Sequence, residues 1–579
     1  MSFPLDLHIK TAIYHVQKTP FLYLIIYILF SNGLFCQTLE LKIEDDSEIE
    51  TSIIDSLNYK KSHINYLSIK SEVDSIQNTL FRNGYIENEL KSVSRLNDSV
   101  YSAKFLLKKK YNTVYIYYNK SNVDFKILNM VSKEVFDDYF ILEFNKVESS
   151  LNFINSKISE KGFPFSKLSL TNIAIREETE LSANLVLAST EQKRTINNIV
   201  IKGYDKFPQS YLKYYLKVRP ANTFNLGVIK SKTEKLNDLK FASEAKPPEV
   251  LFSKDSTTLY LYLNKAKSNS FDGFLGFGTN EKSNKLKFNG YLDLNLTNNL
   301  NYGESFKLLY KGEQNDQKTF ETNLTLPYLF KSPLGMDLML RIFKRDSSFT
   351  TVNQSAKLHY QINSKPKISA GLLNLQSNNL LQDISISSIF DYKTSYYAFG
   401  YQFLNRRNSN LLFRTNSFAN LEYNFGKRTQ TNTEEKQYLL SIDAFKIFNL
   451  DHKNSTFLRI NSSILNSKTY FENELLRFGG INSIRGFEEN SIYATLFGII
   501  NTEYRYRINN SIYIHTITDA GYFENKITNT KEKLLGFGFG FGILTKAGLL
   551  KFNYANGKIE NTSFKLSNSK IHLSLTANF

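Results

Sequence analysis

From about Ser270 to the end of the chain, apolar residues recur at every second position in segment after segment. In 288–296, for example, apolar residues and glycine alternate with Asn, Tyr and Asp. Strands with one apolar and one polar face suit a wall between lipid and a wet lumen, and soluble β-sandwiches do not usually need so many consecutive long strands. Sixteen strands are predicted: 271–279, 286–297, 303–313, 317–328, 334–345, 351–363, 366–376, 394–404, 416–426, 436–448, 455–467, 493–508, 511–523, 534–545, 549–556 and 570–579. An even number lets the end strands pair, so we predict a membrane β-barrel over 269–579.

One stretch of this half, 478–487, does not alternate and reads Phe-Gly-Gly-Ile-Asn-Ser-Ile-Arg-Gly-Phe. Its three glycines give the backbone freedom that a sharply folded loop requires. Arg485 stands near apolar residues and would need an acidic partner if it were buried. We therefore expect an inward-folded loop, 470–492, pinned in the lumen through Arg485, Gly486 and Phe487. An ordinary glycine-rich exposed turn is the alternative that these residues leave open.

Two carboxylates on the following strands are candidate partners for Arg485. By alternation, Glu503 lies on the inward face of the twelfth predicted strand and Asp519 on that of the thirteenth. Charge-assisted contacts of arginine with carboxylates are strong and can be bidentate. Pairing of Glu503 with Arg505 or Arg507 of the barrel wall is the open alternative.

The segment 536–542 alternates glycine and phenylalanine strictly. It resembles a nucleotide-binding loop only superficially, because no helix follows it. As a strand, it directs three phenylalanines towards lipid. Its glycines face the lumen and leave the wall there without side chains, so a folded-in loop can approach it closely. These glycines are Gly536, Gly538, Gly540 and Gly542.

Little in the sequence indicates enzymatic chemistry. His515 and Asp519 share one strand face, but no Gly-x-Ser-x-Gly motif is present, and a polar lumen wall explains the pair more simply. Cys36 is the single cysteine, so a chain cleaved after it has no thiolate for a metal or a nucleophile. We expect no enzyme, no metal and no cofactor.

An apolar run from Phe21 to Phe35 is shorter than the ~20 residues that span a bilayer and follows two lysines. This pattern is typical of a signal peptide, predicted as 1–36 with cleavage near Gln37. The bulky Phe35 argues against lipidation of Cys36. The net charge of +17 is spread along the whole chain, which indicates a solvated surface rather than nucleic-acid binding. Association with anionic lipid headgroups is left open.

Between Leu39 and Lys267, a strand, two helical stretches and two strands recur three times. Helical spacing is clearest in Val147, Leu151, Ile154 and Ile158. Each repeat can bury a small core. Three small α+β domains are predicted, at 37–110, 111–192 and 193–268. Three ordinary α+β modules, or one larger domain, are the alternatives.

Several of these motifs resemble a known family. The repeated element order, with Gly84-Tyr85 and Gly162-Phe163 after helices, is similar to polypeptide-transport-associated (POTRA) domains, although no such pair precedes Phe241. Residues 484–487, Ile-Arg-Gly-Phe, between the eleventh and twelfth strands, and 519–521, Asp-Ala-Gly, resemble the BamA/TamA outer-membrane surface-antigen superfamily. Three domains before sixteen strands are closest to TamA by architecture. BamA usually carries five, and two-partner secretion transporters carry two.

The resemblance implies an outer-membrane assembly or translocation factor, with its barrel in the outer membrane and its N-terminal domains in the periplasm. Its implied partners are unfolded outer-membrane or secreted client proteins and outer-membrane lipid. An inner-membrane partner that spans the periplasm, or lipoproteins, are left open. The family's domains hold extended clients against sheet edges, which tolerates varied sequences. The alternative function is a passive channel or transporter whose loop constricts the pore.

The resemblance further implies that clients are inserted or translocated at the seam between the first and last strands. The first strand contains Gly273 and Gly276, and the last presents Leu573 and Leu575 before a terminal aromatic, Phe579. A short seam with glycines should open more easily than an average strand pair, because fewer side chains pack across it. The terminal aromatic resembles the recognition signal of outer-membrane barrels.

Overall fold

The computed structural model describes residues 38–45, 47–188, 193–279, 286–312, 317–381, 388–407, 410–431, 433–560, 562–563 and 569–578. The expected signal peptide, its cleavage site near Gln37 and the terminal Phe579 lie outside these residues. The chain forms two compact units, one ending at Lys193 and one beginning at Arg194.

The first unit begins with a small α+β module. Its elements are β1 (Leu39–Glu44), α2 (Glu48–Asp55), β2 (Ser62–His63), α3 (Tyr66–Arg82), β3 (Glu89–Arg95) and β4 (Val100–Leu106). The sheet order is β2-β1-β4-β3, with β1 parallel to β4. Helix α3 buries Ile69, Val73, Ile76 and Leu80, which follow the expected helical spacing. Gly84 after the helix has φ +102°, and a Cβ there would lie 2.1 Å from the Tyr111 carbonyl oxygen.

A second module of the same kind completes the first unit. It contains β5 (Thr113–Tyr117), α4 (Phe125–Leu128), β6 (Tyr139–Glu143), α5 (Val147–Glu160), β7 (Lys167–Glu177) and β8 (Glu180–Ala188). The sheet order is β6-β5-β8-β7. Helix α5 buries Ile154 and Ile158 as its spacing predicts. In both modules a short strand, β2 or β6, lies between the helices; the sequence pattern missed these strands because runs of two or five residues show too little alternation.

The second unit begins with a third module. It contains β9 (Asn198–Lys202), a π-helical turn η2 (Tyr211–Tyr215), α6 (Leu226–Thr233), η3 (Glu234–Asp238), β10 (Ala242–Phe252) and β11 (Thr257–Lys265), with sheet order β10-β11-β9. Its core is rich in aromatic side chains and extends to Tyr328 of the following barrel.

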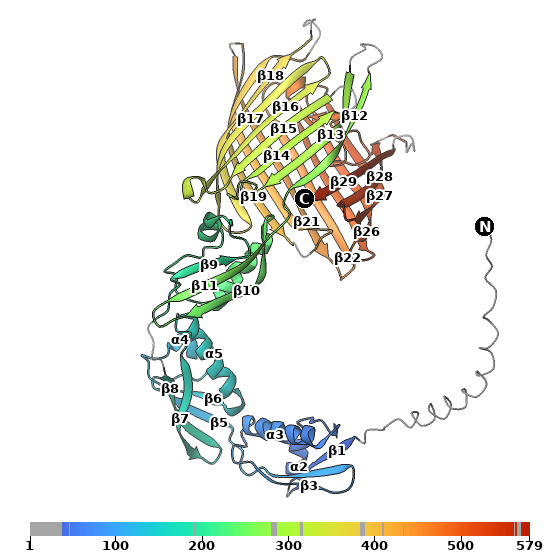
Figure 1. The fold of residues 1–579 in the computed structure, drawn as a ribbon. Helices are drawn as coiled ribbons and strands as arrows, with labels where there is room; N and C mark the ends of the chain where they lie inside the picture. Colours follow the sequence, from blue (N-terminus) through green and yellow to red (C-terminus); the bar gives the residue numbers. More distant parts are fainter. Residues whose placement is uncertain are drawn as a thin grey trace, which may run out of the picture. The chain divides into compact units, whose positions relative to one another are not determined.

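Sixteen antiparallel strands close into a barrel, so the predicted fold class is confirmed (Figure 1). They are β12 (Ser270–Thr279), β13 (Leu286–Thr297), β14 (Ser305–Gly312), β15 (Gln317–Leu326), β16 (Leu334–Arg345), β17 (Phe349–Gln361), β18 (Pro366–Asn379), β19 (Tyr392–Arg406), β20 (Thr415–Gln430), β21 (Thr433–Asn449), β22 (Asn454–Asn466), β25 (Leu496–Arg507), β26 (Ile512–Asn525), β27 (Thr530–Leu544), β28 (Leu549–Ile559) and β29 (Ser569–Asn578). Several strands are longer than predicted, β20 among them, because polar residues continue a strand beyond its apolar stripe.

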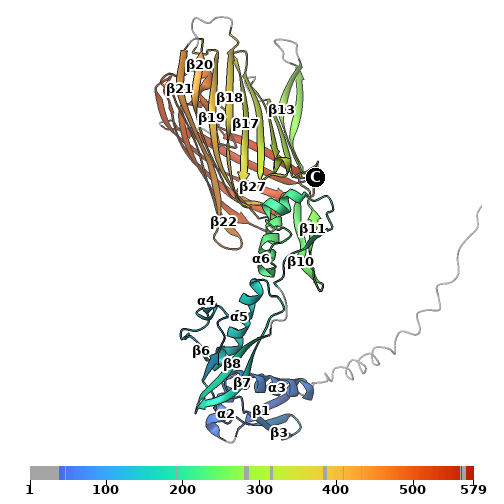
Figure 2. The same ribbon diagram turned by 90° about the vertical axis from the view of Figure 1, so that its left-hand side faces the viewer.

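Figure 2 shows strands β17 to β21 side by side in the barrel wall. The described side chains of the wall are apolar on its outer face and mostly polar on its inner face. On β19, buried residues alternate with exposed ones such as Tyr397 and Phe399. Phe537 and Phe539 are exposed likewise, as the Gly-Phe repeat predicts. This is the arrangement of a strand between lipid and a wet lumen. None of the helices among the described residues is long and apolar enough to cross a membrane.

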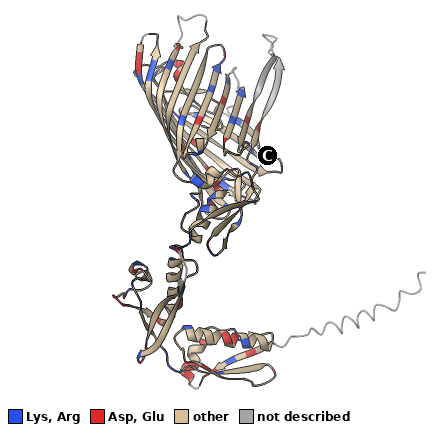
Figure 3. Ribbon diagram, turned by 60° about the vertical axis from the view of Figure 1, so that its left-hand side comes forward, with Lys and Arg blue, Asp and Glu red and all other residues tan. Residues whose placement is uncertain are grey.

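Charged residues are mixed over the described parts of the ribbon, with Lys and Arg interspersed among Asp and Glu (Figure 3). The third module, 193–268, nevertheless holds 15 Lys and Arg against 6 Asp and Glu, so the net charge of +17 is not spread evenly along the chain.

Tyrosines attach the third module to turns at one end of the barrel. The Tyr211 hydroxyl donates to the Gly303 carbonyl oxygen at 3.1 Å, and the Asn298 amide donates to the Tyr204 hydroxyl at 2.5 Å. The Tyr211 and Tyr328 rings meet edge to face, 5.0 Å apart. Burial raises the pKa of the Tyr211 phenol, so this group stays protonated and keeps donating.

Candidate functional site

A long loop between β22 and β25 enters the barrel lumen. It carries a short helical turn η6 (Glu472–Glu474) and a two-stranded ribbon of β23 (Leu476–Phe478) and β24 (Ile492–Ala494). Gly479, Gly480 and Gly486 all have positive φ, between 90° and 115°. Ile484 is fully buried and Arg485 is only 5% exposed, so this stretch is not an exposed turn.

Arg485 lies between the two carboxylates that alternation placed on the inward face. Its Nε and Nη2 donate to the two oxygens of Asp519 at 2.8 and 2.5 Å, and its backbone N–H donates to Asp519 Oδ2 at 2.9 Å. Its Nη1 donates to Glu503. We call Arg485, Glu503 and Asp519 the inner clamp. Bidentate, charge-assisted contacts of this kind combine strength with a fixed orientation.

Glu503 pairs with Arg485 of the loop and with an arginine of the wall at the same time. Its second oxygen accepts from Arg505, whose Nε and Nη2 lie 2.7 Å away. Arg507 instead donates to the His452 carbonyl oxygen. Two arginines therefore face two carboxylates, and their formal charges cancel inside the lumen.

The possible hydrolytic pair is not formed. Both Asp519 oxygens accept from Arg485, whereas His515 Nε2 lies 2.9 Å from Asn553 Oδ1. The structure therefore gives His515 no acidic partner in Asp519. Among the described residues, no group of three or more His, Cys, Asp or Glu side chains is arranged to hold a metal ion.

The loop backbone touches the wall at paired glycines. A Cβ on Gly536 of β27 would lie 2.3 Å from the Arg485 carbonyl oxygen. A Cβ on Gly486 would lie 2.3 Å from the backbone nitrogen of Gly557. Gly536 and Gly557 are register partners on β27 and β28. Two adjacent strands thus leave room for one turn of loop backbone. The sequence prediction missed Gly557 because it ended that strand at 556.

The other three glycines of β27 have different neighbours. A Cβ on Gly538 would meet the backbone of β28, and one on Gly540 or Gly542 would meet His515 or Tyr513 of β26. For these three glycines, a role in accommodating the loop stays a prediction, because their nearest neighbours belong to the wall. Their space is taken by the wall itself.

An apolar cluster packs beneath the loop. Ile484 and Phe478 from the loop contact residues of β25, β26 and β27, and Phe487 packs against the edge of the cluster. The Phe478 and Phe497 rings stack 4.5 Å apart. Removing these side chains from water stabilises the folded-in position alongside the ion pairs.

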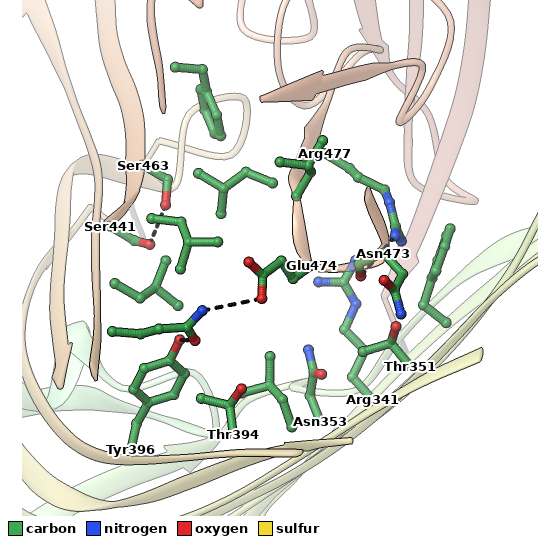
Figure 4. A pocket seen from close by; sticks show the side chains of 18 of the residues that line it. Arg341, Thr351, Asn353, Thr394, Tyr396, Ser441, Ser463, Asn473, Glu474 and Arg477 are labelled. Atoms are coloured by element: carbon green, nitrogen blue, oxygen red, sulfur yellow. Dashed lines mark hydrogen bonds between the residues drawn. The ribbon is translucent and has the colours of Figure 1, made fainter. Parts of the chain in front are cut away.

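A second ion-pair cluster holds the outer part of the loop. Arg428 of β20, only 3% exposed, donates to Glu474 of the loop and to Glu435 of β21, both at 2.6 Å. Its guanidinium lies over the Phe471 ring, 3.7 Å from the centroid. Gln437 also donates to Glu474, at 3.2 Å (Figure 4). We call Arg428, Glu435 and Glu474 the outer clamp. The sequence prediction missed it because it ended the ninth strand at 426.

The loop tip reaches strands close to the barrel seam. Glu489 pairs with Lys311 of β14, and Glu488 pairs with Lys570 of β29, both at 3.0 Å. One short segment of loop therefore contacts the wall on both sides of the junction between the first and last strands.

The seam itself is short. Only Ser270 with Asn578 and Phe271 with Ala577 pair between β12 and β29 in the described residues, whereas ten pairs join β12 to β13 and eight join β28 to β29. Gly273 approaches β13, since a Cβ there would lie 2.5 Å from the Tyr291 carbonyl oxygen. Gly276 also lies in β12, within this weakly paired region.

The apolar face of the last strand is open. Leu573 is 64% exposed and Leu575 is 41% exposed. This exposure agrees with the expected outward stripe of β29.

Fold and site together define a class: an outer-membrane β-barrel protein in which small α+β domains, normally periplasmic, precede a sixteen-stranded barrel with a lumen loop. Within this class, residues 343–543 match the family model described as haemolysin secretion/activation protein ShlB/FhaC/HecB. The matched residues make up less than half of the chain. No curated protein matches the sequence.

Solved structures share the fold at low sequence identity. CdiB from Acinetobacter baumannii has a TM-score of 0.52 and 15% identity, and the alignment covers 91% of this chain and 98% of that one. CdiB from Escherichia coli has a TM-score of 0.52 and 12% identity, with 88% and 98% covered. BamA from Haemophilus ducreyi lacking POTRA domains 1–3 has 14% identity, with 80% and 99% covered, and a TM-score of 0.49.

The family model and the fold support the resemblance to the superfamily. Closeness to TamA stays a prediction, because none of these matches bears on it.

Proposed function

We propose that this protein inserts or translocates client polypeptides at the seam of its barrel, after its small N-terminal domains have received them in an extended form. The observation that supports this proposal best is the short seam, with two paired residues on each side. Insertion or translocation does not require chemical catalysis, and the matching family model is described by secretion and activation.

The seam leaves backbone groups available for a client strand. Most residues of β12 and β29 pair on one side only. Unpaired N–H and C=O groups at an edge are a template for another strand, and in lipid they are costly to leave unsatisfied. A client strand that pairs there gains hydrogen bonds and at the same time transfers its apolar face into lipid.

The loop supports a role in controlling this edge. Its tip is ion-paired to β14 and β29, so a shift of the loop changes contacts on both flanks of the seam. The inner clamp fixes the same tip to β25 and β26. Under this proposal, the clamps hold the resting barrel, and client binding shifts the loop.

The first two modules offer suitable receiving edges. Strand β7 is a terminal strand of its sheet and spans eleven residues, and β3 is terminal in the first module. Backbone pairing at such an edge is tolerant of client sequence, which a general factor requires.

Locking the seam tests the proposal. Phe271→Cys with Ala577→Cys places two thiols on register partners across the seam. Oxidation should abolish client insertion or secretion, and reductant should restore it. A matched pair on a different interface, Leu294→Cys with Leu308→Cys between β13 and β14, should have no effect. Full activity with the seam oxidised would rule out seam opening.

A passive channel is the second candidate, favoured by a cavity of about 360 Å³ between the loop and the wall, which both polar and apolar side chains line. Single-channel recordings with client assays separate the two. A steady, selective pore in a protein whose loss leaves client proteins unaffected would favour the channel.

A further inference from the structure

We infer that the barrel lumen contains a binding site for an anionic group of carboxylate or phosphate chemistry, held by Arg341 and Arg477. The site lies in the cavity between loop residues 473–477 and the wall strands β16–β22, which we call the lumen pocket (Figure 4). It is separate from the inner clamp, and it would exist in a passive channel as well as in a translocation factor.

Arg477 is a half-buried cation with no acidic partner among the described residues. It lies on β23, and its guanidinium is 4.0 Å from the centroid of Phe343 and 4.7 Å from that of Phe349. Its Nη2 donates a long hydrogen bond to the Asn473 carbonyl oxygen at 3.4 Å, and its buried Nε has no hydrogen-bond partner among the described residues. Aromatic faces attract a cation but do not accept its N–H groups as a carboxylate does.

Arg341 of β16 is only loosely neutralised. Its ion pair with Glu321 spans 3.9 Å, and its buried Nε also has no hydrogen-bond partner among the described residues. Figure 4 shows Arg341 and Arg477 on the same side of the lumen pocket, close to Asn473 and Thr351. Two guanidinium groups from different elements, loop and wall, thus border one space.

The carboxylates of the pocket are already engaged. Glu474 accepts from Arg428 at 2.6 Å, and Asp443 accepts from Arg459 at 2.7 Å. Because these acids have other partners, the two pocket arginines leave an excess of positive charge. A charge in a partly dry space is costly unless it is paired. A carboxylate or phosphate would supply the acceptors that the planar guanidinium groups match.

Two sources share this chemistry: a free anion, or an acidic side chain of a polypeptide in the lumen. The full-length protein in detergent micelles is titrated calorimetrically with inorganic phosphate, and separately with an extended Asp-containing peptide and its Asn analogue. Chloride is used to match ionic strength. Binding of phosphate alone identifies a free-anion site, and binding of the Asp peptide over its Asn analogue identifies a chain-borne carboxylate.

Arg477→Met should weaken the observed binding about tenfold or more, since a charge-assisted contact is lost. It should not lower the thermal unfolding midpoint in chloride, because an unpaired cation is replaced by an apolar side chain beside two phenylalanine rings. Lys427→Met removes the same charge from an exposed ion pair outside the pocket and should bind like the unmodified protein.

Binding of neither probe would overturn the inference, as would equal binding by Arg477→Met and the unmodified protein. Arg341→Met provides the second variant: the wall arginine should also be required. Heat-modifiability on gels verifies that each variant is a folded barrel before it is titrated.

Discussion

The loop is held by two clamps, and the loop carries the positive charge in one and the negative charge in the other. In the inner clamp the loop provides the cation, Arg485, and the wall provides both carboxylates. In the outer clamp the wall provides the cation, Arg428, and the loop provides Glu474. The Asp519 side chain is fully buried and pairs with Arg485, whereas Arg428 has a second acid, Glu435.

This difference teaches which contact is harder to replace. Loss of Arg485 leaves Asp519 buried without its cation, whereas loss of the Glu474 charge leaves Arg428 paired with Glu435. A buried ion left alone costs far more than a weakened pair. The inner clamp should therefore dominate stability, and the outer clamp should adjust the loop position.

The largest effect is expected from Arg485→Ala. It should lower the free energy of unfolding of the barrel by about 3–5 kcal/mol, because it leaves a buried carboxylate unpaired. Urea unfolding of the protein in lipid vesicles measures this loss, and heat-modifiability on gels gives a second readout. Adding Asp519→Asn to Arg485→Ala should recover part of the stability. If both readouts were unchanged in Arg485→Ala, the pinning role would be wrong.

A smaller effect is expected from Gly536→Ala, which tests the backbone contact of the inner clamp. The new methyl group would meet the Arg485 carbonyl oxygen at 2.3 Å and push the loop away, at a cost of about 1–3 kcal/mol. Gly498→Ala is the matched control, since its Cβ would meet only Ser462 Oγ at 3.7 Å. Equal unfolding midpoints for the two variants would contradict the close approach.

The smallest effect is expected from Glu474→Gln in the outer clamp. A neutral hydrogen bond replaces a charge-assisted one, at a cost of about 1 kcal/mol. The outer part of the loop should become more accessible to protease added from outside. Glu434→Gln removes a carboxylate from an exposed pair on the same strand as Glu435 and should change neither readout. Identical protease sensitivity in both variants would exclude the outer clamp as a loop anchor.

The inner clamp was visible in the sequence because Arg485 interrupts a regular pattern. Around it, period-two alternation defines which residues of β25 and β26 face inward, so Glu503 and Asp519 could be named in advance. Alternation also gave the number of barrel strands, because each strand has lipid on one face.

The outer clamp and the lumen pocket were not visible, for a physical reason. Arg428, Glu435 and Glu474 lie where strands pass into polar turns, and the hydrophobic pattern disappears there. Their association depends on where a loop folds back over strands distant in sequence. The sequence did not reveal the role of Gly557 either. A glycine is needed there because the backbone of Gly486 in the loop comes close to it.

The tyrosine contacts of the third module have a mechanical consequence. The hydroxyls of Tyr211 and Tyr214 bond to the turns that follow β13 and β15, and only 266–269 separate β11 from β12. A pulling force on this module is therefore transmitted to the first strands of the barrel. These strands lie beside the seam, which has the fewest paired residues. Force from a client polypeptide bound to this module would therefore act on the barrel close to its seam, where the fewest backbone hydrogen bonds have to be broken.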